Sequence, residues 1–338
     1  MKWYDNTAEH ADIVLSTRVR LARNLKDYPF PARLNEKGKE EVCAVVRDAL
    51  LTGDRAKDYD YVPMRSLSHT RAVSLAEKHL ISPEFASDSE GRALILSKEE
   101  DVSIMLCEED HVRVQVIYPG LSLEEAYRKA DELDEALSGK VAIAFDPRLG
   151  YLTQCPTNLG TGLRASVMLH LPALSRGGAM QHLANTVAKL GLILRGAYGE
   201  GSKPVGDIYQ LSNQVTLGIS EQAAIKNLES IANQIIAQEK SARGTLLKDD
   251  MFIDRIWRAY GILRSAHMLS CSEFMDLGSL VRIGAAEGIL DVPVQTMTRL
   301  LVEMQPATLN TAQGKNCTPA ERDVLRAKAV KEALKGSR

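Results

Sequence analysis

Residues 93–118 read ALILSKEEDVSIMLCEEDHVRVQVIY, three apolar runs separated by charged turns. In the last run the side-chain character alternates, with the period of two that a half-buried strand requires. One face receives Val112, Val114, Val116 and Tyr118, and the other Arg113, Gln115 and Ile117. Residues 93–96, 102–107 and 112–118 are therefore predicted to be successive strands of an antiparallel sheet.

Helices and further strands are expected on both sides of this segment. Ser122 is predicted to begin a helix, with Glu125 three residues later completing a capping box. Strands are expected at residues 141–145, 166–171 and 207–211, with a helix over 174–190. The predicted fold class is α+β, an antiparallel sheet flanked by helices.

The last third of the chain has a different pattern. After Ser220 the strand signal stops, and Ile225, Leu228 and Ile231 repeat at helical spacing. More helices are expected near residues 252–263, 272–287, 294–304 and 319–334. The charged stretch 239–250 is the predicted boundary of an all-α C-terminal domain, although a helix running through it stays open.

Composition excludes several classes of protein. The 338 residues include 42 Lys and Arg against 44 Asp and Glu, so no basic field favours nucleic acid. The acidic N-terminus does not resemble a signal peptide, and no apolar run approaches the roughly 20 residues of a membrane helix. A cytoplasmic protein without membrane attachment is expected. The five cysteines contain no CxxC pair, which disfavours disulfides and a zinc site, and no metal held by protein side chains is expected.

Two glycine-rich stretches resemble nucleotide-binding motifs but lack their essential parts. Residues 160–165 fit the pattern GxGxxA, yet a predicted strand follows where a helix is needed. Gly196 and Gly201 have P-loop spacing, but Ser202 stands at the position of the lysine. The glycine loop and the HRD and DFG motifs of protein kinases are missing too.

Arginines in strand-like or glycine-rich contexts suggest a phosphate site. They are Arg18, Arg20, Arg113, Arg164 and Arg195. Arg18 and Arg20 are two apart in an extended segment, so their guanidinium groups would point the same way and could grip phosphate oxygens in bidentate fashion. The alternative for each arginine alone is a surface ion pair.

Two acidic residues supply a complementary charge. Glu109 lies just before Arg113, and Glu200 follows Arg195 in a glycine-rich loop. Carboxylates beside arginines usually form structural ion pairs, so spacing alone leaves their catalytic role open.

Four blocks resemble, in order, the signature motifs of the ATP:guanido phosphotransferases, the family of creatine and arginine kinases. They are STRVR at 16–20, EEDHVR at 108–113, CPTNLGTGLRA at 155–165 and RGAYGE at 195–200. The resemblance implies a phosphagen kinase-like catalytic domain over residues 13–243. It also implies that Glu109 and Glu200 bind the guanidinium, with the Cys155 thiol near the reacting group, and that ATP and Mg²⁺ are required.

The same resemblance implies the ATP contacts. These would come from Ser16, Thr17, Arg18, Val19, Arg20, His79 and Arg113, from Arg164 and Arg195, and from the backbone around Arg164, Ala165, Ser166, Val167 and Met168 and around Arg195, Gly196, Ala197, Tyr198, Gly199 and Glu200. One departure is Cys107, which stands where the family commonly has Asn before Glu-Glu-Asp-His.

The C-terminal part narrows the resemblance to bacterial protein-arginine kinases of the McsB type. Arg18 stands almost at the start, so the N-terminal helical domain of the free-guanidino kinases is expected to be missing. Residues 244–338 would instead be a helical domain for regulation, phosphoarginine binding and oligomerisation. Such a protein would phosphorylate exposed arginines of proteins.

Near the C-terminus, Thr318, Pro319 and Glu321 predict a capped helix. It begins with a motif that resembles the allosteric phosphoarginine pocket of that family, comprising Arg322, Asp323, Val324, Leu325, Arg326 and Ala327. From spacing alone, a solvated helix face is the alternative.

The family implies further partners: a zinc-binding activator protein, a Clp-type protease that degrades marked proteins and a heat-shock repressor that is inactivated. A homodimer or higher oligomer is expected. Two other functions stay open, a small-molecule guanidino kinase and a non-catalytic phosphoarginine-binding adaptor.

Overall fold

The strand pattern of residues 93–118 extends into an eight-stranded sheet in the computed structural model, which describes residues 2–5, 8–197 and 204–335. The strand order is β2-β3-β4-β5-β1-β8-β10-β9, and each neighbouring pair is antiparallel. The strands are β1 (Val14–Arg23), β2 (Tyr59–Pro63), β3 (Ala93–Ser97), β4 (Val102–Leu106), β5 (Val112–Pro119), β8 (Leu163–His170), β9 (Leu192–Gly196) and β10 (Ile208–Asn213). The predicted antiparallel sheet and α+β class are confirmed.

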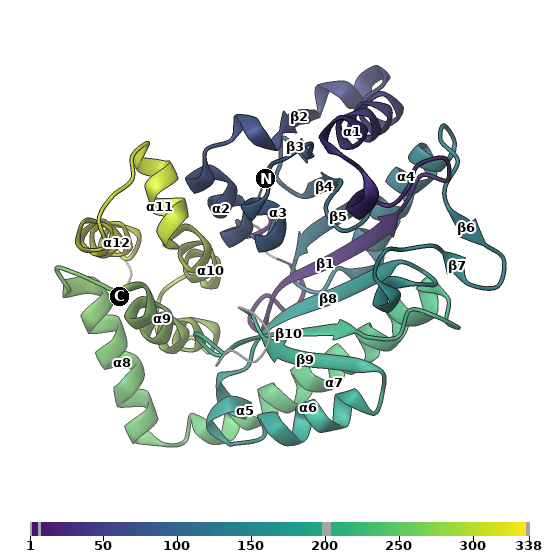
Figure 1. Cartoon of the computed structure of the whole chain (residues 1–338). Coiled ribbons are helices and arrows are strands. Elements are labelled where there is room, and N and C mark those ends of the chain that lie inside the picture. The colour runs from purple at the N-terminus through teal and green to yellow at the C-terminus, as the bar shows by residue number, and fades with distance from the viewer. Residues whose placement is uncertain (1, 6–7, 198–203, 336–338) are drawn as a thin grey trace.

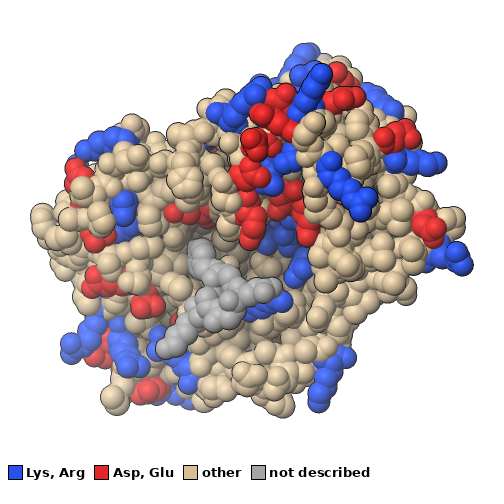
Figure 2. Space-filling view, in the orientation of Figure 1, with Lys and Arg blue, Asp and Glu red and all other residues tan. Residues whose placement is uncertain are grey.

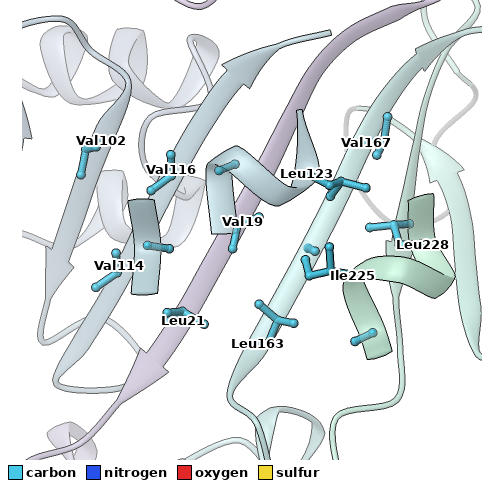
Figure 3. Packing of buried hydrophobic residues seen from close by; sticks show 14 of the residues in the cluster. Val19, Leu21, Val102, Val114, Val116, Leu123, Leu163, Val167, Ile225 and Leu228 are labelled. Carbon is cyan, nitrogen blue, oxygen red and sulfur yellow. The ribbon is translucent and has the colours of Figure 1, made fainter. Parts of the chain in front are cut away.

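Helices cover one face of this sheet (Figure 1). They are α1 (Glu36–Leu50), α4 (Leu123–Ser138), α6 (Met180–Ala188) and α7 (Glu221–Leu246). Alternate residues of the central strands, such as Val19 and Val114, are fully buried against Leu123, Ile225 and other apolar side chains of these helices (Figure 3). Burying apolar surface on one face is the main stabilising contribution and fixes the strand register. The opposite face of β1, β5 and β8 is left for the polar residues described below.

Three local predictions are wrong. Residues 141–145 do not form a continuous strand: Ile143 makes an isolated bridge to Leu25, and Phe145–Asp146 (β6) pairs with Gly150–Tyr151 (β7) across a turn in which the Asp146 carboxylate accepts the Arg148 and Leu149 amides. The helix over 174–190 is two helices, α5 (Pro172–Arg176) and α6, which Gly178 at φ +71° separates. Ser122 starts α4 without a capping box, because its hydroxyl donates to the Pro119 carbonyl.

The C-terminal part is helical, as predicted. Its helices are α8 (Asp250–Ser265), α9 (Cys271–Ala286), α10 (Val294–Glu303), α11 (Pro306–Gln313) and α12 (Pro319–Ala333). Helix α7 runs into the predicted boundary 239–250 but ends within it, at Leu246, and α8 begins at Asp250, so one helix does not continue through the whole stretch. Among the C-terminal helices, α11 packs against α2 (His69–Glu77), whose Glu77 carboxylate accepts the Ala307 and Thr308 amides, and α3 (Pro83–Ser87) lies next to α2 (Figure 1). Within the described ranges, no helix combines the length and apolar character needed to cross a membrane.

Candidate functional site

Four arginines gather on the face of the sheet that the large helices leave open. Arg18 and Arg20 alternate with buried Val19 along β1, so both side chains lie on the face opposite the core, as the spacing predicts. Strand register places Arg164 of β8 directly opposite Arg20. It places Arg113 of β5 opposite Ala22, on the same face. Three neighbouring strands thus position the four guanidinium groups.

These arginines line one cavity of about 430 Å³. The same cavity is lined by Glu84, Glu109, Cys155, Thr157, Asn158 and Gln210. In the space-filling view, Lys and Arg side chains adjoin Asp and Glu side chains at the hollow above the grey residues (Figure 2). The cavity therefore has a cationic floor and carboxylates at its side.

The cationic floor is suited to an anion with several oxygens. The guanidinium of Arg18 donates to the Gln210 amide oxygen at 2.8 Å. Burial and the positive charges of Arg164 and Arg113 lower the pKa of Arg18 to about 10, so it stays charged at neutral pH. Burial and the positive charges of Arg18, Arg113 and Arg164 lower the pKa of Arg20, whose buried Nε finds no hydrogen-bond partner among the described residues. Phosphate oxygens would relieve both this repulsion and the unmade bond.

Of the two glutamates next to Arg113, Glu109 is the one that a ligand in the cavity can reach. Glu108 is held by Arg113 at 2.7 Å and by the Ser82 hydroxyl at 2.7 Å, and its side chain is 7% exposed. Glu109 accepts from Arg113 at 2.6 Å and from the Asn158 amide at 3.4 Å, and its side chain is 35% exposed. Its carboxylate lines the cavity, whereas that of Glu108 does not.

The next two residues of this segment are structural, a role that sequence reasoning missed. The buried Asp110 carboxylate accepts from the Asn24 amide and from the backbone N–H of Gln154, each at 2.7 Å. His111 accepts the Leu25 N–H at Nδ1, at 3.0 Å, and donates from Nε2 to the Pro29 carbonyl at 2.9 Å. Asp110 thereby fixes the segment that leads to Cys155 beside the turn that carries Glu109.

Cys155 enters the cavity from a short loop. Its Sγ lies 3.0 Å from the Thr157 hydroxyl, and both side chains line the cavity with Glu109. Gly162, at φ +63°, ends the loop, and a Cβ there would meet the Ala22 carbonyl oxygen at 2.6 Å. The glycine is thus needed for close backbone approach. Strand β8, rather than a helix, begins directly after Gly162. The GxGxxA pattern at residues 160–165 is therefore not part of a dinucleotide-binding fold, as predicted.

A second cavity of about 810 Å³ adjoins the first and shares Arg18, Arg20 and Arg113 with it. Its other walls include Val73, Ala76, Ile81 and Met105 together with His79 and Gln115. Burial and Arg18 lower the pKa of His79 to about 3, so its ring is neutral. Ser16, Ser166 and Met168 form a smaller hollow with His79 and Arg18. An apolar cavity joined to a cationic one suits a nucleoside with attached phosphates.

Other residues expected to contact ATP are placed differently. Thr17 donates to the Gly120 carbonyl, and Val19, Ala165 and Val167 are buried in the core, so these four side chains are directed away from the cavities. Arg195 lies opposite Gln210, on the cavity face but at the sheet edge. Gly196 ends β9, and Ala197 lines the second cavity. Tyr198, Gly199 and Glu200 lie outside the described residues.

The two arginines of the C-terminal motif differ in burial and in their hydrogen-bond partners. Arg326 is 1% exposed and donates to the Met304 and Leu269 carbonyls, at 2.9 and 2.7 Å, and to Asp323 at 2.7 Å. Arg322 is partly exposed and donates to the Cys317 carbonyl at 2.6 Å. Asp323 therefore pairs with Arg326 inside the domain. The predicted capping box at Thr318 and Glu321 is present.

The departure at Cys107 lies in the turn between β4 and β5, just before Glu108. Cys107 adopts φ +58°, a left-handed conformation that Asn tolerates better than Cys. Its thiol is buried and directed toward the Lys39 carbonyl at 3.6 Å, away from the cavity. The substitution thus affects backbone strain in the turn rather than a cavity contact.

Comparisons with known proteins show the family to which the chain belongs. A model of the C-terminal catalytic domain of ATP:guanido phosphotransferases matches residues 41–242, and a model of the protein-arginine kinase McsB C-terminal domain matches residues 249–338. The chain is 46% identical to the protein-arginine kinase of Halothermothrix orenii over 335 residues, covering 98% of this chain and 96% of that protein. It is 42% identical to that of Geobacillus stearothermophilus over 338 residues, covering 98% and 93%.

Solved structures extend the likeness to the catalytic fold. A lombricine kinase matches with a TM-score of 0.60 and 26% identity, over 72% of this chain and 70% of that one. The duplicated taurocyamine kinase of Schistosoma mansoni, with bound transition-state analogue components, matches with a TM-score of 0.60 and 28% identity, over 71% of this chain and 35% of that one. The chain belongs to the protein-arginine kinase family, on the fold of the ATP:guanido phosphotransferases.

Proposed function

We propose that this protein transfers the γ-phosphoryl group of ATP to arginine side chains of proteins. The observation that carries the proposal is a single cavity in which four arginines meet the accessible carboxylate of Glu109. Such a cavity can hold a polyphosphate and a guanidinium side by side, whereas a cavity of arginines alone would repel the second substrate.

The residues divide into those that bind the donor and those that prepare the acceptor. Arg18, Arg20, Arg113 and Arg164 bind the phosphates and stabilise the charge that the transferred phosphoryl group carries at the transition state. The apolar cavity at His79 receives the nucleoside. Mg²⁺ would be held mainly by phosphate oxygens and water, where it neutralises phosphate charge.

The acceptor must be activated because a guanidinium with a pKa above 12 is a poor nucleophile. Glu109 would orient it and accept its proton, together with Glu200, whose role rests on the family resemblance. Cys155, which lines the same cavity as Glu109, would contact the guanidinium with its thiol. The phosphoryl group leaves the ADP oxygen and bonds to the guanidinium nitrogen, which loses one proton to the carboxylate.

A protein acceptor is favoured over a free guanidino compound by the relatives, which are named protein-arginine kinases, and by the match of residues 249–338 to a C-terminal domain of that family. We assign residues 13–243 to catalysis and 244–338 to regulation and self-association. Within the latter, the segment from Arg322 to Ala327 would bind phosphoarginine, with the partly exposed Arg322 as the phosphate ligand.

The cellular role that we propose rests on the resemblance to the same family. Phosphoarginine would mark proteins for a Clp-type protease and inactivate a heat-shock repressor in a stress response. A zinc-binding protein would activate the enzyme, which would act in the cytoplasm as a dimer or larger assembly.

A competition experiment tests the choice of acceptor. The full chain is incubated with ATP and Mg²⁺, and ADP release is followed with free arginine or with an unfolded arginine-rich protein at equal arginine concentration. A protein-arginine kinase gives faster ADP release with the protein. Equal or faster release with free arginine would support a small-molecule kinase. No release with either acceptor would favour a required activator first and the adaptor second.

A further inference from the structure

A series of buried hydrogen bonds joins α9, a helix of the C-terminal part, to the end of the sheet. Arg282 of α9 lies 2.9 Å from His170 Nδ1, at the end of β8. His170 Nε2 lies 2.9 Å from the Ser279 hydroxyl, and this hydroxyl lies 2.8 Å from the Asp207 carboxylate. Arg282, His170 and Ser279 are all at most 1% exposed.

The donors and acceptors along this series of hydrogen bonds have one consistent assignment. A guanidinium can only donate, so Nδ1 of His170 must accept, and the ring proton of His170 lies on Nε2. Nε2 then donates to Ser279, whose own proton is directed to Asp207, because a carboxylate only accepts. Burial and the positive charges of Arg282, Arg243 and Arg176 hold the pKa of His170 well below its usual range, which agrees with a neutral ring.

Arg282 also reaches the segment before β1. It donates to the Asp12 carbonyl at 2.9 Å and to the Ala11 carbonyl at 2.7 Å. Arg243 of α7 donates to the same Asp12 carbonyl and to that of His170, each at 3.4 Å. Two buried arginines thus tie the start of β1, which carries Arg18 and Arg20, to the end of β8, which carries Arg164.

Asp207 fixes the third strand of this group. It adopts φ +54°, its carbonyl accepts the Leu171 N–H at 2.9 Å, and β10 with Gln210 follows directly. The preceding Gly206, at φ +64°, lies so close to α9 that a Cβ would meet the Met275 carbonyl oxygen at 3.0 Å. Glu200 precedes Asp207 by seven residues in the sequence. In Figure 1 α9 approaches the end of the sheet beside β10.

We propose that Ser279 and Arg282 are positioning residues for phosphoryl transfer, which hold the ends of β1, β8 and β10 relative to one another through His170 and Asp207. The proposal rests on the proposed function. It makes α9 of the C-terminal domain a structural part of the catalytic unit, because small displacements of groups that align donor and acceptor reduce the rate strongly.

Ser279→Ala in the full chain tests the proposal. We expect kcat for arginine phosphorylation to fall at least about tenfold, while the Kd of an ATP analogue changes less than about twofold. The matched control is Ser272→Ala, at an exposed serine of the same helix. It should leave kcat and the Kd of the ATP analogue within about twofold of the wild-type values. Assays are run well below the unfolding temperature of each variant. A kcat for Ser279→Ala equal to that of the control would overturn the proposal.

A second pair of variants tests the series of hydrogen bonds at its other end. Asp207→Asn keeps an oxygen acceptor for Ser279 and tolerates the left-handed backbone, so kcat should stay near that of the wild type. Asp207→Ala removes the acceptor and should behave like Ser279→Ala. Equal impairment of both Asp207 variants would contradict the assigned series of hydrogen bonds.

Amide hydrogen exchange separates this inference from the proposed function. Ser279→Ala should accelerate exchange of the Leu171 amide, which bonds to the Asp207 carbonyl, whether or not the protein transfers phosphate. Unchanged exchange there would overturn the inference alone. A wild-type protein that phosphorylates no arginine would overturn the proposed function.

Discussion

The Glu109 carboxylate lies 2.6 Å from the Arg113 guanidinium, so one ion pair joins the proposed phosphate-binding side of the cavity to its proposed guanidinium-binding side. Each partner is also a candidate ligand of a different substrate. A phosphate that binds Arg113 competes with Glu109, and Glu109 then becomes available to a cationic acceptor. This exchange makes the binding of the two substrates interdependent.

The first prediction is that ATP analogues strengthen arginine binding. Calorimetry should show a Kd for an arginine peptide that is about 5- to 10-fold lower with a non-hydrolysable ATP analogue than without it. In Arg113→Met, which removes the ion pair of Glu109 permanently, the peptide should bind without this dependence. Arg65→Met, at an exposed arginine that pairs with Glu36 and Glu40, is the control. Identical peptide affinity with and without nucleotide in the wild type would refute the exchange.

The second prediction concerns the cost of placing four partly buried arginines together. Replacing Arg20 with Met removes a partly buried charge that Arg18, Arg113 and Arg164 repel, so the free energy of unfolding should rise by about 1 kcal/mol or more while activity is lost. Inorganic triphosphate should raise the unfolding temperature of the wild type more than that of Arg20→Met. The exposed Arg33 provides the matched control, Arg33→Met. A lower unfolding temperature for Arg20→Met would show that the repulsion is compensated.

The third prediction is a dependence of stability on pH that arises at His79. Its pKa is about 3 in the folded protein, against 6.5 for an ordinary histidine. Between these values the unfolded chain binds a proton that the folded protein does not, so the free energy of unfolding falls as the pH is lowered from 6.5, by about 1.4 kcal/mol per pH unit. Above 6.5 this contribution is constant.

Urea unfolding of His79→Asn between about pH 5 and pH 7 checks this sign and size. Asn tolerates the left-handed backbone of His79, at φ +61°. In this variant the free energy of unfolding should depend less steeply on pH, by the contribution of His79 given above. His182→Asn, at an exposed histidine of α6, should leave the dependence unchanged. If the free energy of unfolding of His79→Asn depended on pH as steeply as that of the wild type, His79 would not be buried in its neutral form.

The fourth prediction separates the two arginines of the C-terminal motif. Arg326→Ala leaves two buried carbonyls and Asp323 without their donor, so it should reduce the free energy of unfolding by about 3 kcal/mol. Arg322→Ala loses one bond at a partly exposed position and should cost less than about 1 kcal/mol. Phosphoarginine binding, measured by calorimetry, should nevertheless be lost in Arg322→Ala. Retained binding in that folded variant would exclude Arg322 as the phosphate ligand.

Sequence reasoning could predict the sheet because the alternation of Val112, Val114 and Val116 is dictated by burial against helices on one face. It could predict that Arg18 and Arg20 share a face because the strand period is two. It failed at Phe145 and at Gly178, where a single turn or glycine overrides a longer apolar pattern. Such local competition is decided by individual hydrogen bonds.

The candidate site was predictable only in part. The motifs identify Glu109, Cys155 and the arginines, but spacing does not show that Glu108 is already held by Ser82 whereas Glu109 is accessible. Nor does the sequence show that Ser279 of the C-terminal domain reaches Asp207, because that contact depends on how the two parts pack. Long-range contacts of this kind have no local signature in composition or periodicity.

The central claim, that the cavity transfers phosphate to a guanidinium held by Glu109, is tested most directly by mass spectrometry under mild, non-acidic conditions. The full chain and Glu109→Gln are each incubated with ATP, Mg²⁺ and an arginine-rich unfolded protein, and phosphorylated residues are identified. We predict acid-labile phosphate on arginine with the wild type and at least about 100-fold less with Glu109→Gln, while ATP still binds the variant. Phosphate on other residue types alone, or undiminished phosphoarginine with Glu109→Gln, would contradict the account.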